Sequence, residues 1–271
     1  MHGCGNDYIY LDGWDQPLPE DAPALARRLS DRHFSIGSDG LVYVLRGERL
    51  PARMRMWNAD GSEAEMCGNA IRCVAKLLFE RGHVREETIP IETKAGPRPV
   101  SVSVSGGEVA RATVAMGTPK VGESLELTVA GTSVRGLQVD VGNPHFVIFE
   151  EELRDERVLG LGPLLERHER FPNRTNVEFV KVLSPGRLQV RVWERGSNET
   201  LACGTGACAA LVAARSTGRA GDRALVALPG GELQVEWLGG AGPILLTGPC
   251  ETAFSGSVEV DPGRGGGAPA S

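Results

Sequence analysis

The sequence has no run or stripe of basic residues and no apolar stretch approaching the length of a membrane span. Its formal net charge is −6 over 271 residues. Nucleic-acid binding needs clustered Lys and Arg, so this charge gives that function no support. A membrane-spanning helix needs roughly 20 apolar residues, and the apolar stretches here are far shorter. We therefore expect neither nucleic acid nor membrane as a partner.

The sequence also lacks the charged and apolar regions of a signal peptide at its start. We accordingly expect a cytoplasmic protein whose 6 cysteines are free, because disulfides are rare in reducing compartments. The tight C-x2-C spacing of structural zinc sites is missing between Cys67 and Cys73 and between Cys203 and Cys208. No metal site is expected.

Two segments of the chain are copies of each other, and each contains one cysteine at the same place. The segments run from Trp57 to Gly82 and from Trp193 to Gly218. In both, the cysteine follows the tryptophan by ten residues, a glycine comes next, and the closing glycine lies fifteen residues after the cysteine. A match of this length indicates an internal duplication.

Other parts of the chain repeat at nearly the same separation as Cys67 and Cys203, with differences of a residue or two. It pairs Gly5-Asn6 with Gly142-Asn143, and Asp39 with Asn176. This period is far longer than that of solenoid or propeller repeats, and roughly 100–200 residues make one domain. We predict an N-terminal domain over residues 1–113, completed by a strand returning at 250–260, a duplicate C-terminal domain over 114–249, and a disordered Gly/Pro-rich tail at 261–271.

Apolar alternation between Gly or Pro turns predicts many short strands and only a few helices. Helix periodicity occupies residues 22–32, 68–81, 159–166 and 204–217. The apolar stripe over 70–81 is too broad for one face, so this helix should be buried nearly all round. Strands are expected at residues 8–11, 40–45, 53–57, 89–92, 99–104, 110–116, 134–139, 145–150, 177–182, 187–194, 223–227, 233–238 and 244–247.

Cys67 and Cys203 each come where a strand-like run gives way to a central helix. Each sulfur should lie at a helix N-terminus, where unpaired N–H groups bind anions and favour thiolate over thiol. If the halves pack about a pseudo-twofold axis, the two sulfurs can face one carbon from opposite sides. One thiolate would remove an α-proton while the other thiol supplies one, and oriented N–H dipoles on the carboxylate would replace pyridoxal phosphate as the means of stabilising the carbanion.

Six motifs occur in order between about residue 2 and residue 260: HGCGNDY, NADGSEAEMCGNAIRC, GNPHFV, ERFPNRTN, ERGSNETLACGTGA and PGGELQVEW. Together they resemble the diaminopimelate epimerase family. The resemblance implies a cofactor-independent isomerase that interconverts LL- and meso-2,6-diaminopimelate in lysine and peptidoglycan biosynthesis. It also implies an α/β (α+β) fold of two pseudo-symmetric domains, each a β-barrel-like sheet wrapped around a central helix, with the active site in the cleft between them. A bacterial homodimer is expected from the same relatives.

The resemblance assigns roles to matching positions. It implies Cys67 and Cys203 as the acid/base pair, with His145 and Glu194 as supporting catalytic residues. Donors for the substrate carboxylate at the helix starts would be Gly68, Asn69, Gly204 and Thr205, and the rest of the substrate would be read by Asn6, Asn58, Asn143, Asn176, Glu194 and Arg195. The charges of diaminopimelate agree with this, because a forked guanidinium suits its distal carboxylate and a carboxylate suits its ammonium.

Other interpretations stay open at this point. A proline racemase or hydroxyproline epimerase shares the cysteine pair but is expected to have CGHG at the first cysteine and no ERG before the second, whereas this chain has CGNA and Glu194-Arg195. The phenazine-related isomerases lack the pair. A duplicated binding module with structural thiols is the third alternative, since an Asn beside Gly is usually a turn residue and a Glu-Arg pair is usually a solvated surface feature.

Overall fold

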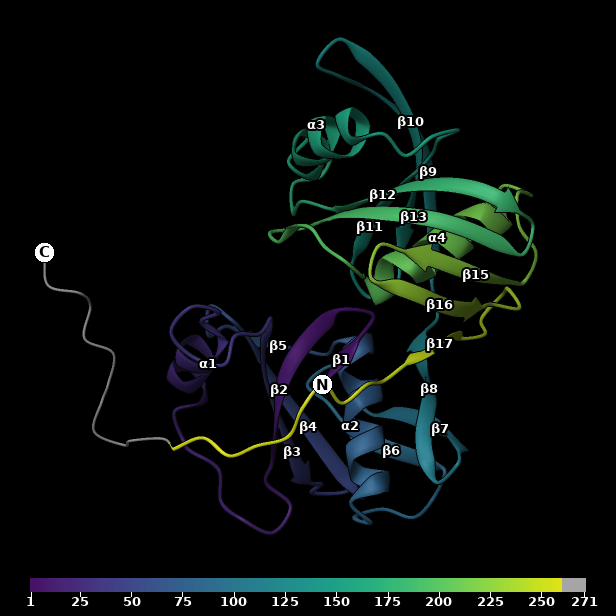
Figure 1. The fold of residues 1–271 in the computed structure, drawn as a ribbon. Helices are drawn as coiled ribbons and strands as arrows, with labels where there is room; N and C mark the ends of the chain where they lie inside the picture. The colour runs from purple at the N-terminus through teal and green to yellow at the C-terminus, as the bar shows by residue number, and fades with distance from the viewer. Residues whose placement is uncertain (260–271) are drawn as a thin grey trace, which may run out of the picture. The chain divides into compact units, whose positions relative to one another are not determined.

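The computed structural model describes residues 1–259, so the tail predicted at 261–271 lies outside the described residues. The chain forms two compact units of mixed α/β structure (Figure 1). One unit comprises Met1–Ala112 together with the described residues from Cys250 onward, and the other comprises Thr113–Pro249. The boundary falls inside one strand, β8 (Glu108–Gly117). The predicted mixed α/β fold class is confirmed.

The elements of the two units follow one another in the same order. The first unit contains β1 (His2–Gly3), β2 (Asn6–Asp12), α1 (Ala22–Ser30), β3 (Gly40–Arg46), β4 (Ala52–Asn58), β5 (Glu63–Ala64), α2 (Gly68–Glu80), β6 (Thr88–Glu92) and β7 (Arg98–Ser105). The second contains β9 (Lys120–Val129), β10 (Thr132–Asp140), β11 (Pro144–Phe149), α3 (Asp155–Glu166), β12 (Asn176–Ser184), β13 (Arg187–Glu194), β14 (Asn198–Glu199), α4 (Gly204–Ser216), β15 (Arg223–Leu228), β16 (Gly231–Glu236) and β17 (Ile244–Pro249).

Strand pairing repeats from one unit to the other. In the first unit β2 runs parallel to β3, β3 antiparallel to β4, β4 antiparallel to β5 and parallel to β6, and β6 antiparallel to β7. In the second, β11, β12, β13, β14, β15 and β16 pair in the same order and the same sense. In each unit a helix, α1 or α3, makes the crossover between the first two parallel strands. This repeated topology matches the duplicated segments of the sequence.

Strand register fixes which residues of the two copies correspond. Tyr8 lies opposite Gly40, and His145 lies opposite Asn176. Because Asn6 aligns with Asn143, Tyr8 is the counterpart of His145, and their strand partners Gly40 and Asn176 correspond as well. The predicted correspondence of Asn176 with Asp39 is therefore wrong by one residue. The difference arises because the crossover in the first unit is one residue longer, and loops absorb such a change without disturbing the strands.

A central helix lies inside the strands of each unit. In α4 the ten buried residues include the whole run from Gly206 to Ala214, and the helix contacts β9 to β13 and β15 to β17. Figure 1 shows it behind β12, β13, β15 and β16. Helix α2 contacts β1, β2, β3 and β7 and buries ten of its thirteen residues, including Arg72 and Lys76. The prediction that this helix is buried nearly all round is confirmed.

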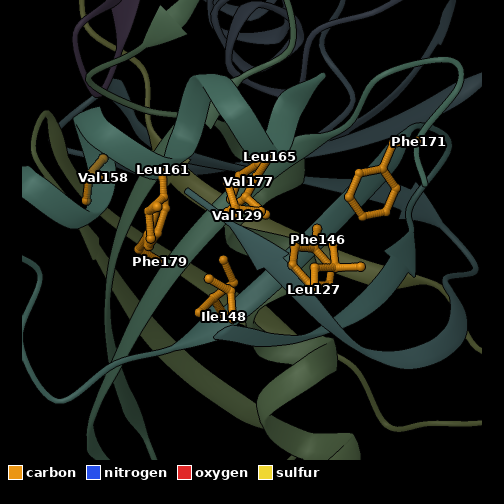
Figure 2. Packing of buried hydrophobic residues seen from close by; sticks show 11 residues of the cluster. Leu127, Val129, Phe146, Ile148, Val158, Leu161, Leu165, Phe171, Val177 and Phe179 are labelled. Atoms are coloured by element: carbon orange, nitrogen blue, oxygen red, sulfur yellow. The ribbon is translucent and has the colours of Figure 1, made fainter. Parts of the chain in front are cut away.

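The outer helices build a second core on the other side of the strands. Residues of α3 and Phe171, which follows it, pack with apolar side chains of β9 to β12. Figure 2 labels Leu127, Val129, Phe146, Ile148, Val158, Leu161, Leu165, Phe171, Val177 and Phe179 of this cluster. Helix α1 packs in the same manner on β3 and β4 through Leu25, Ala26 and Leu29 against Leu41, Tyr43 and Trp57. In each unit, strands are thereby packed on one face by the central helix and on the other by the outer helix.

The two-residue strands β1, β5 and β14 were not predicted, and three longer segments also differ from the predictions. Strand β9 was not predicted, because the first half of Lys120–Val129 is exposed and contains Gly122. Helix α3 begins at Asp155 and not at residue 159. The prediction began too late because the first turn starts with two acidic, exposed residues, which give no apolar periodicity. The strand expected to return at 250–260 is reduced to one bridge between His2 and Glu251, since residues 252–259 are exposed and have no buried alternation. No helix among the described residues has the length and apolarity to cross a membrane.

Candidate active-site residues

Both predicted cysteines stand at the starts of the central helices. Cys67 is the N-cap residue of α2, and Cys203 is the N-cap residue of α4. Their backbones are extended, with φ −131° and ψ 125° for Cys67 and φ −114° and ψ 112° for Cys203. An extended N-cap leaves the first helical N–H groups unpaired by the helix. At Cys203 one of them is used, because the N–H of Gly206 donates to Sγ at 3.3 Å.

In the first unit, two predicted asparagines lie at the Cys67 sulfur. The Cys67 Sγ donates to Asn6 Oδ1 at 3.4 Å, and Asn69 Nδ2 donates to the same oxygen at 3.3 Å. Asn6 Nδ2 donates to Asp39 Oδ2 at 2.8 Å. Because a carboxylate accepts only, this last bond fixes the amide so that its oxygen faces the sulfur. Asn6 therefore offers Cys67 an acceptor.

The Asp39 carboxylate is itself held by a cation. Arg32 bridges Asp7 at 2.6 Å and Asp39 at 3.0 Å, and the N–H of Asp7 donates to Asp39 at 3.2 Å. Burial raises the pKa of Asp39, while the hydrogen bond from Asn6 and the charge of Arg32 oppose that rise. Asp39 was not among the residues predicted for the site. The sequence signal for Asp39 was its position directly before β3, the strand that pairs with β2, which begins at Asn6.

Buried Arg72 orients the other asparagine. Its guanidinium is 0% exposed and donates to Gly68 O and to Asn69 Oδ1, both at 3.0 Å. With its oxygen turned to Arg72, Asn69 must turn Nδ2 toward Asn6. A Cβ added to Gly3 would lie 2.9 Å from the Arg72 guanidinium, so the β1 backbone closes over it. An arginine between apolar residues, as in the sequence AIRCVA, was the sequence signal for this role.

Asn58, at the end of β4, is placed in a turn. Its side chain donates to Ser62 Oγ at 3.0 Å and its N–H to Ser62 O at 2.9 Å. Gly61 in the same turn has φ +83°. The side chain of Asn58 thus stabilises the connection that leads into the Cys67 segment.

In the second unit, four predicted residues form one chain of hydrogen bonds. The Cys203 Sγ lies 3.4 Å from Thr205 Oγ1, and Asn143 Nδ2 donates to the same hydroxyl at 3.4 Å. His145 Nε2 lies 2.9 Å from Asn143 Oδ1. The parallel pairing of β11 with β12 and the start of α4 bring these side chains together.

The chain continues to a residue that the sequence analysis missed. Glu178 Oε1 lies 2.7 Å from His145 Nδ1, and both side chains are 0% exposed. Burial raises the pKa of Glu178, and the neighbouring His145 opposes that rise. A single glutamate among apolar strand residues, as in the sequence NVEFV, was the available signal.

Burial has the largest effect on the pKa of Cys203. It raises the pKa of this thiol well above its ordinary value, negative charge on Glu194 or Glu178 would raise it further, and the hydrogen bonds from Thr205 and Gly206 oppose the rise. The helix N-terminus acts in the predicted direction, because the N–H of Gly206 lowers the pKa of the Cys203 thiol, but burial has the larger effect. Burial likewise raises the pKa of Glu194, against the hydrogen bond from the Thr200 hydroxyl.

Glu194 and Arg195 begin a turn that two buried side chains hold. Asn176 Oδ1 accepts from the N–H of Arg195 at 2.9 Å, and Asn176 Nδ2 donates to Pro144 O at 2.9 Å. Both ends of this amide thus bind main chain. The exposed guanidinium of Arg195 reaches Asn173 O at 3.4 Å.

Glu166 holds the same turn from α3. It is 2% exposed and accepts from Trp193 Nε1 at 3.1 Å and from the N–H of Gly196 at 3.0 Å. Glu166 was not among the predicted site residues either. Nothing in the local pattern marks it, because Glu166 ends an ordinary helix and its partners come from β13 and the turn after it.

Comparison with known proteins adds independent evidence. Residues 1–122 and 137–252 match the family described as diaminopimelate epimerase. A diaminopimelate epimerase of Moorella thermoacetica is 44% identical over 275 residues, covering 96% of this chain and 98% of the relative. One of Desulforudis audaxviator is 48% identical over 270 residues, covering 94% and 96%. The solved structure of a probable proline racemase from Agrobacterium radiobacter K84 has a TM-score of 0.71 at 19% identity, covering 97% and 92%, and shows that the two-domain fold is shared.

Proposed function

The chain belongs to the diaminopimelate epimerase family, and from this premise we propose that it interconverts LL- and meso-2,6-diaminopimelate. The observation that carries the proposal is the equivalent placement of Cys67 and Cys203, each capping the central helix of one copy of a duplicated fold. Such an enzyme is an isomerase of amino-acid biosynthesis, on the route to lysine. We further propose a cytoplasmic bacterial homodimer that supplies peptidoglycan precursor and needs no cofactor.

The proposed chemistry moves one proton in and one proton out at the α-carbon. One cysteine, as thiolate, takes the α-proton, and the other, as thiol, gives a proton to the opposite face. The pair shares one dissociable proton, so its titration belongs to the couple and not to either thiol. Each turnover leaves the pair with its protonation exchanged, which makes the reaction reversible without a cofactor.

The helix starts are proposed to hold the carboxylate of the reacting centre. Gly68 and Asn69 open α2, and Gly204 and Thr205 open α4. Their N–H dipoles interact more strongly as negative charge moves from the α-carbon onto the carboxylate, which lowers the barrier to proton removal. Asn6 and Asn143, each hydrogen-bonded beside one cysteine site, and Asn58 are proposed as further substrate contacts.

The distal end of the substrate is assigned to the turn after β13. We assign its carboxylate to Arg195 and its ammonium to Glu194, because opposite charges and a forked guanidinium suit these groups. Asn176 then acts by positioning this turn, since its amide is engaged by the main chain of Arg195 and Pro144.

The proposal is tested by proton NMR of freshly reduced protein with LL-diaminopimelate in D2O, with proline in a parallel tube. We expect loss of the α-proton signal and appearance of the meso isomer. Cys67→Ala and Cys203→Ala should abolish epimerisation. Cys73→Ala and Cys208→Ala remove fully buried thiols from the same two helices and should retain it.

Each other outcome has a distinct meaning. Exchange of proline alone would assign the chain to racemase chemistry, and absence of exchange with either substrate would favour a binding module. Epimerisation at near wild-type rate in either Cys67→Ala or Cys203→Ala would contradict the two-base scheme.

A further inference from the structure

Glu178 stands at a position where a carboxylate is poorly accommodated. It lies within β12 opposite Val147 of β11, and its side chain is 0% exposed. Its Oε1 faces His145 Nδ1 at 2.7 Å. No hydrogen-bond partner for Oε2 exists in the described part of the chain. A buried ionised carboxylate needs donors on both oxygens, so this environment suits the neutral acid better.

The second buried glutamate of this unit gives the contrast. Glu166 is 2% exposed, and its two oxygens accept from the N–H of Gly196 at 3.0 Å and from Trp193 Nε1 at 3.1 Å. It also lies within 3.5 Å of the Arg174 guanidinium. Glu166 therefore has the surroundings of a carboxylate, and Glu178 does not.

The donors and acceptors in the row of hydrogen bonds from Cys203 to Glu178 also favour a protonated Glu178. Asn143 donates its Nδ2 to Thr205, so the oxygen of its amide faces His145 Nε2. An oxygen only accepts, hence Nε2 carries hydrogen. Nδ1 then either carries a second hydrogen, making an imidazolium on a carboxylate, or accepts hydrogen from a protonated Glu178. The second arrangement buries no charge.

We propose that Glu178 is a protonated carboxylic acid that donates to His145 Nδ1 and fixes the Nε2–H tautomer of that histidine. Glu178 is then a positioning residue for Cys203, and this inference rests on the proposed epimerase function. Each donor along the chain points toward the sulfur: His145 to Asn143, Asn143 to Thr205, and the Thr205 hydroxyl to Sγ. Together with the N–H of Gly206, two donors meet the thiolate that remains once Cys203 has given its proton away.

A neutral Glu178 also favours formation of the Cys203 thiolate directly, through its position beside helix α4. A Cβ on Gly206 would lie 3.0 Å from Glu178 Oε1, so this carboxyl packs against the first turn of α4. An ionised Glu178 would place negative charge beside the thiolate and oppose its formation, whereas the acid does not. The corresponding positions of the first unit, by strand register, are Tyr8 and Val42, so the device belongs to the second unit only.

Two substitutions at position 178 separate the acid from the carboxylate. In Glu178→Gln the amide NH2 can donate to Nδ1 as the acid does, and kcat should stay within about threefold of wild type. In Glu178→Leu nothing donates, the tautomer is released, and kcat should fall at least about tenfold with KM little changed, which is the size expected when a buried polar group loses its partner. Glu166→Gln is the matched control, because there the amide replaces a true carboxylate and should be harmful.

Nitrogen-15 NMR of histidine-labelled wild-type protein tests the tautomer without substrate. The His145 signals, assigned by their loss in His145→Gln, should show hydrogen on Nε2 alone under the conditions of the kinetic assay. An imidazolium or an Nδ1–H tautomer would overturn the proposal, as would Glu178→Gln being as slow as Glu178→Leu or Glu178→Leu retaining wild-type kcat. If Glu178→Leu does not fold, the spectrum and Glu178→Gln decide. The spectrum does not depend on the substrate, so failure of the proposed function leaves this result interpretable.

Discussion

Replacement of Glu166 by glutamine tests whether the turn carrying Glu194 and Arg195 is held from α3. The Glu166 carboxylate accepts from Trp193 Nε1 at 3.1 Å and from the N–H of Gly196 at 3.0 Å. Glutamine is nearly isosteric, but only its oxygen can accept. One of the two N–H groups would then lose its partner and face an NH2 group.

The magnitude follows from the kind of bond that is lost. A hydrogen bond to a charged group contributes roughly 1.5–3 kcal/mol, so Glu166→Gln should lower the free energy of unfolding by about 2 kcal/mol. For a large domain, 1 kcal/mol shifts Tm by about 2–4 °C, which gives a fall of roughly 4–8 °C. The KM for diaminopimelate should also rise, because the loosened turn carries the residues proposed to bind the distal end.

Thermal unfolding followed by circular dichroism, together with steady-state kinetics, measures both effects. Glu169→Gln is the matched control, since this exposed glutamate lies three residues further along and should leave Tm and KM unchanged. A Tm for Glu166→Gln within about 1 °C of wild type would show that the two bonds do not hold the turn. An equal fall in Glu169→Gln would mean that general charge, and not the local bonds, is responsible.

Three further substitutions or conditions give clear expectations. Ala130 is exposed with φ +49° in the two-residue turn before Gly131, so Ala130→Asn should raise stability by about 0.5–1 kcal/mol in urea unfolding, and a lower midpoint would speak against this. Gly206→Ala would place a Cβ 3.0 Å from Glu178 Oε1 and 3.1 Å from a methyl of Val192, and should cost roughly 1–3 kcal/mol by the same assay; no loss would mean that the helix start shifts freely. Burial raises the pKa of Glu178 above 4.5, so protonated Glu178 contributes fully to stability below pH 4.5, and this contribution is lost as pH rises through the folded pKa. The free energy of unfolding of the wild type should therefore fall relative to that of Glu178→Gln as pH rises from 4.5 through the folded pKa. A difference that stays constant with pH would contradict this expectation.

Much of the fold follows from pattern alone. Helix α4 could be predicted because Gly204–Ser216 is apolar on every side and is preceded by a strand-like run. Most strands alternate between Gly or Pro turns. Strand β9 escaped because only its second half, with Leu127 and Val129, faces a core, and because its turn begins with Ala130 and not with a usual turn residue.

The candidate site could be predicted where motifs repeat or match the family. Cys67 and Cys203 were found from the duplication, and the residues near them from the family motifs. Glu178 and Glu166 could not be found in this way, because their roles depend on partners from other elements. Which side chain meets Glu178 is decided by the parallel pairing of β11 with β12, and no local pattern specifies that pairing.

The unlike residues at matched positions of the two units, Tyr8 and Val42 in one and His145 and Glu178 in the other, have a thermodynamic consequence. The equilibrium between two isomers is a property of the isomers, so any substitution must change kcat/KM in both directions by one common factor. Divergence of the duplicated halves therefore cannot make the catalyst favour one product. It can change kcat and KM for each isomer, and in the proposed mechanism it can change how protons partition between the two sulfurs of the free protein, and so which isomer finds a larger share of the molecules ready to react.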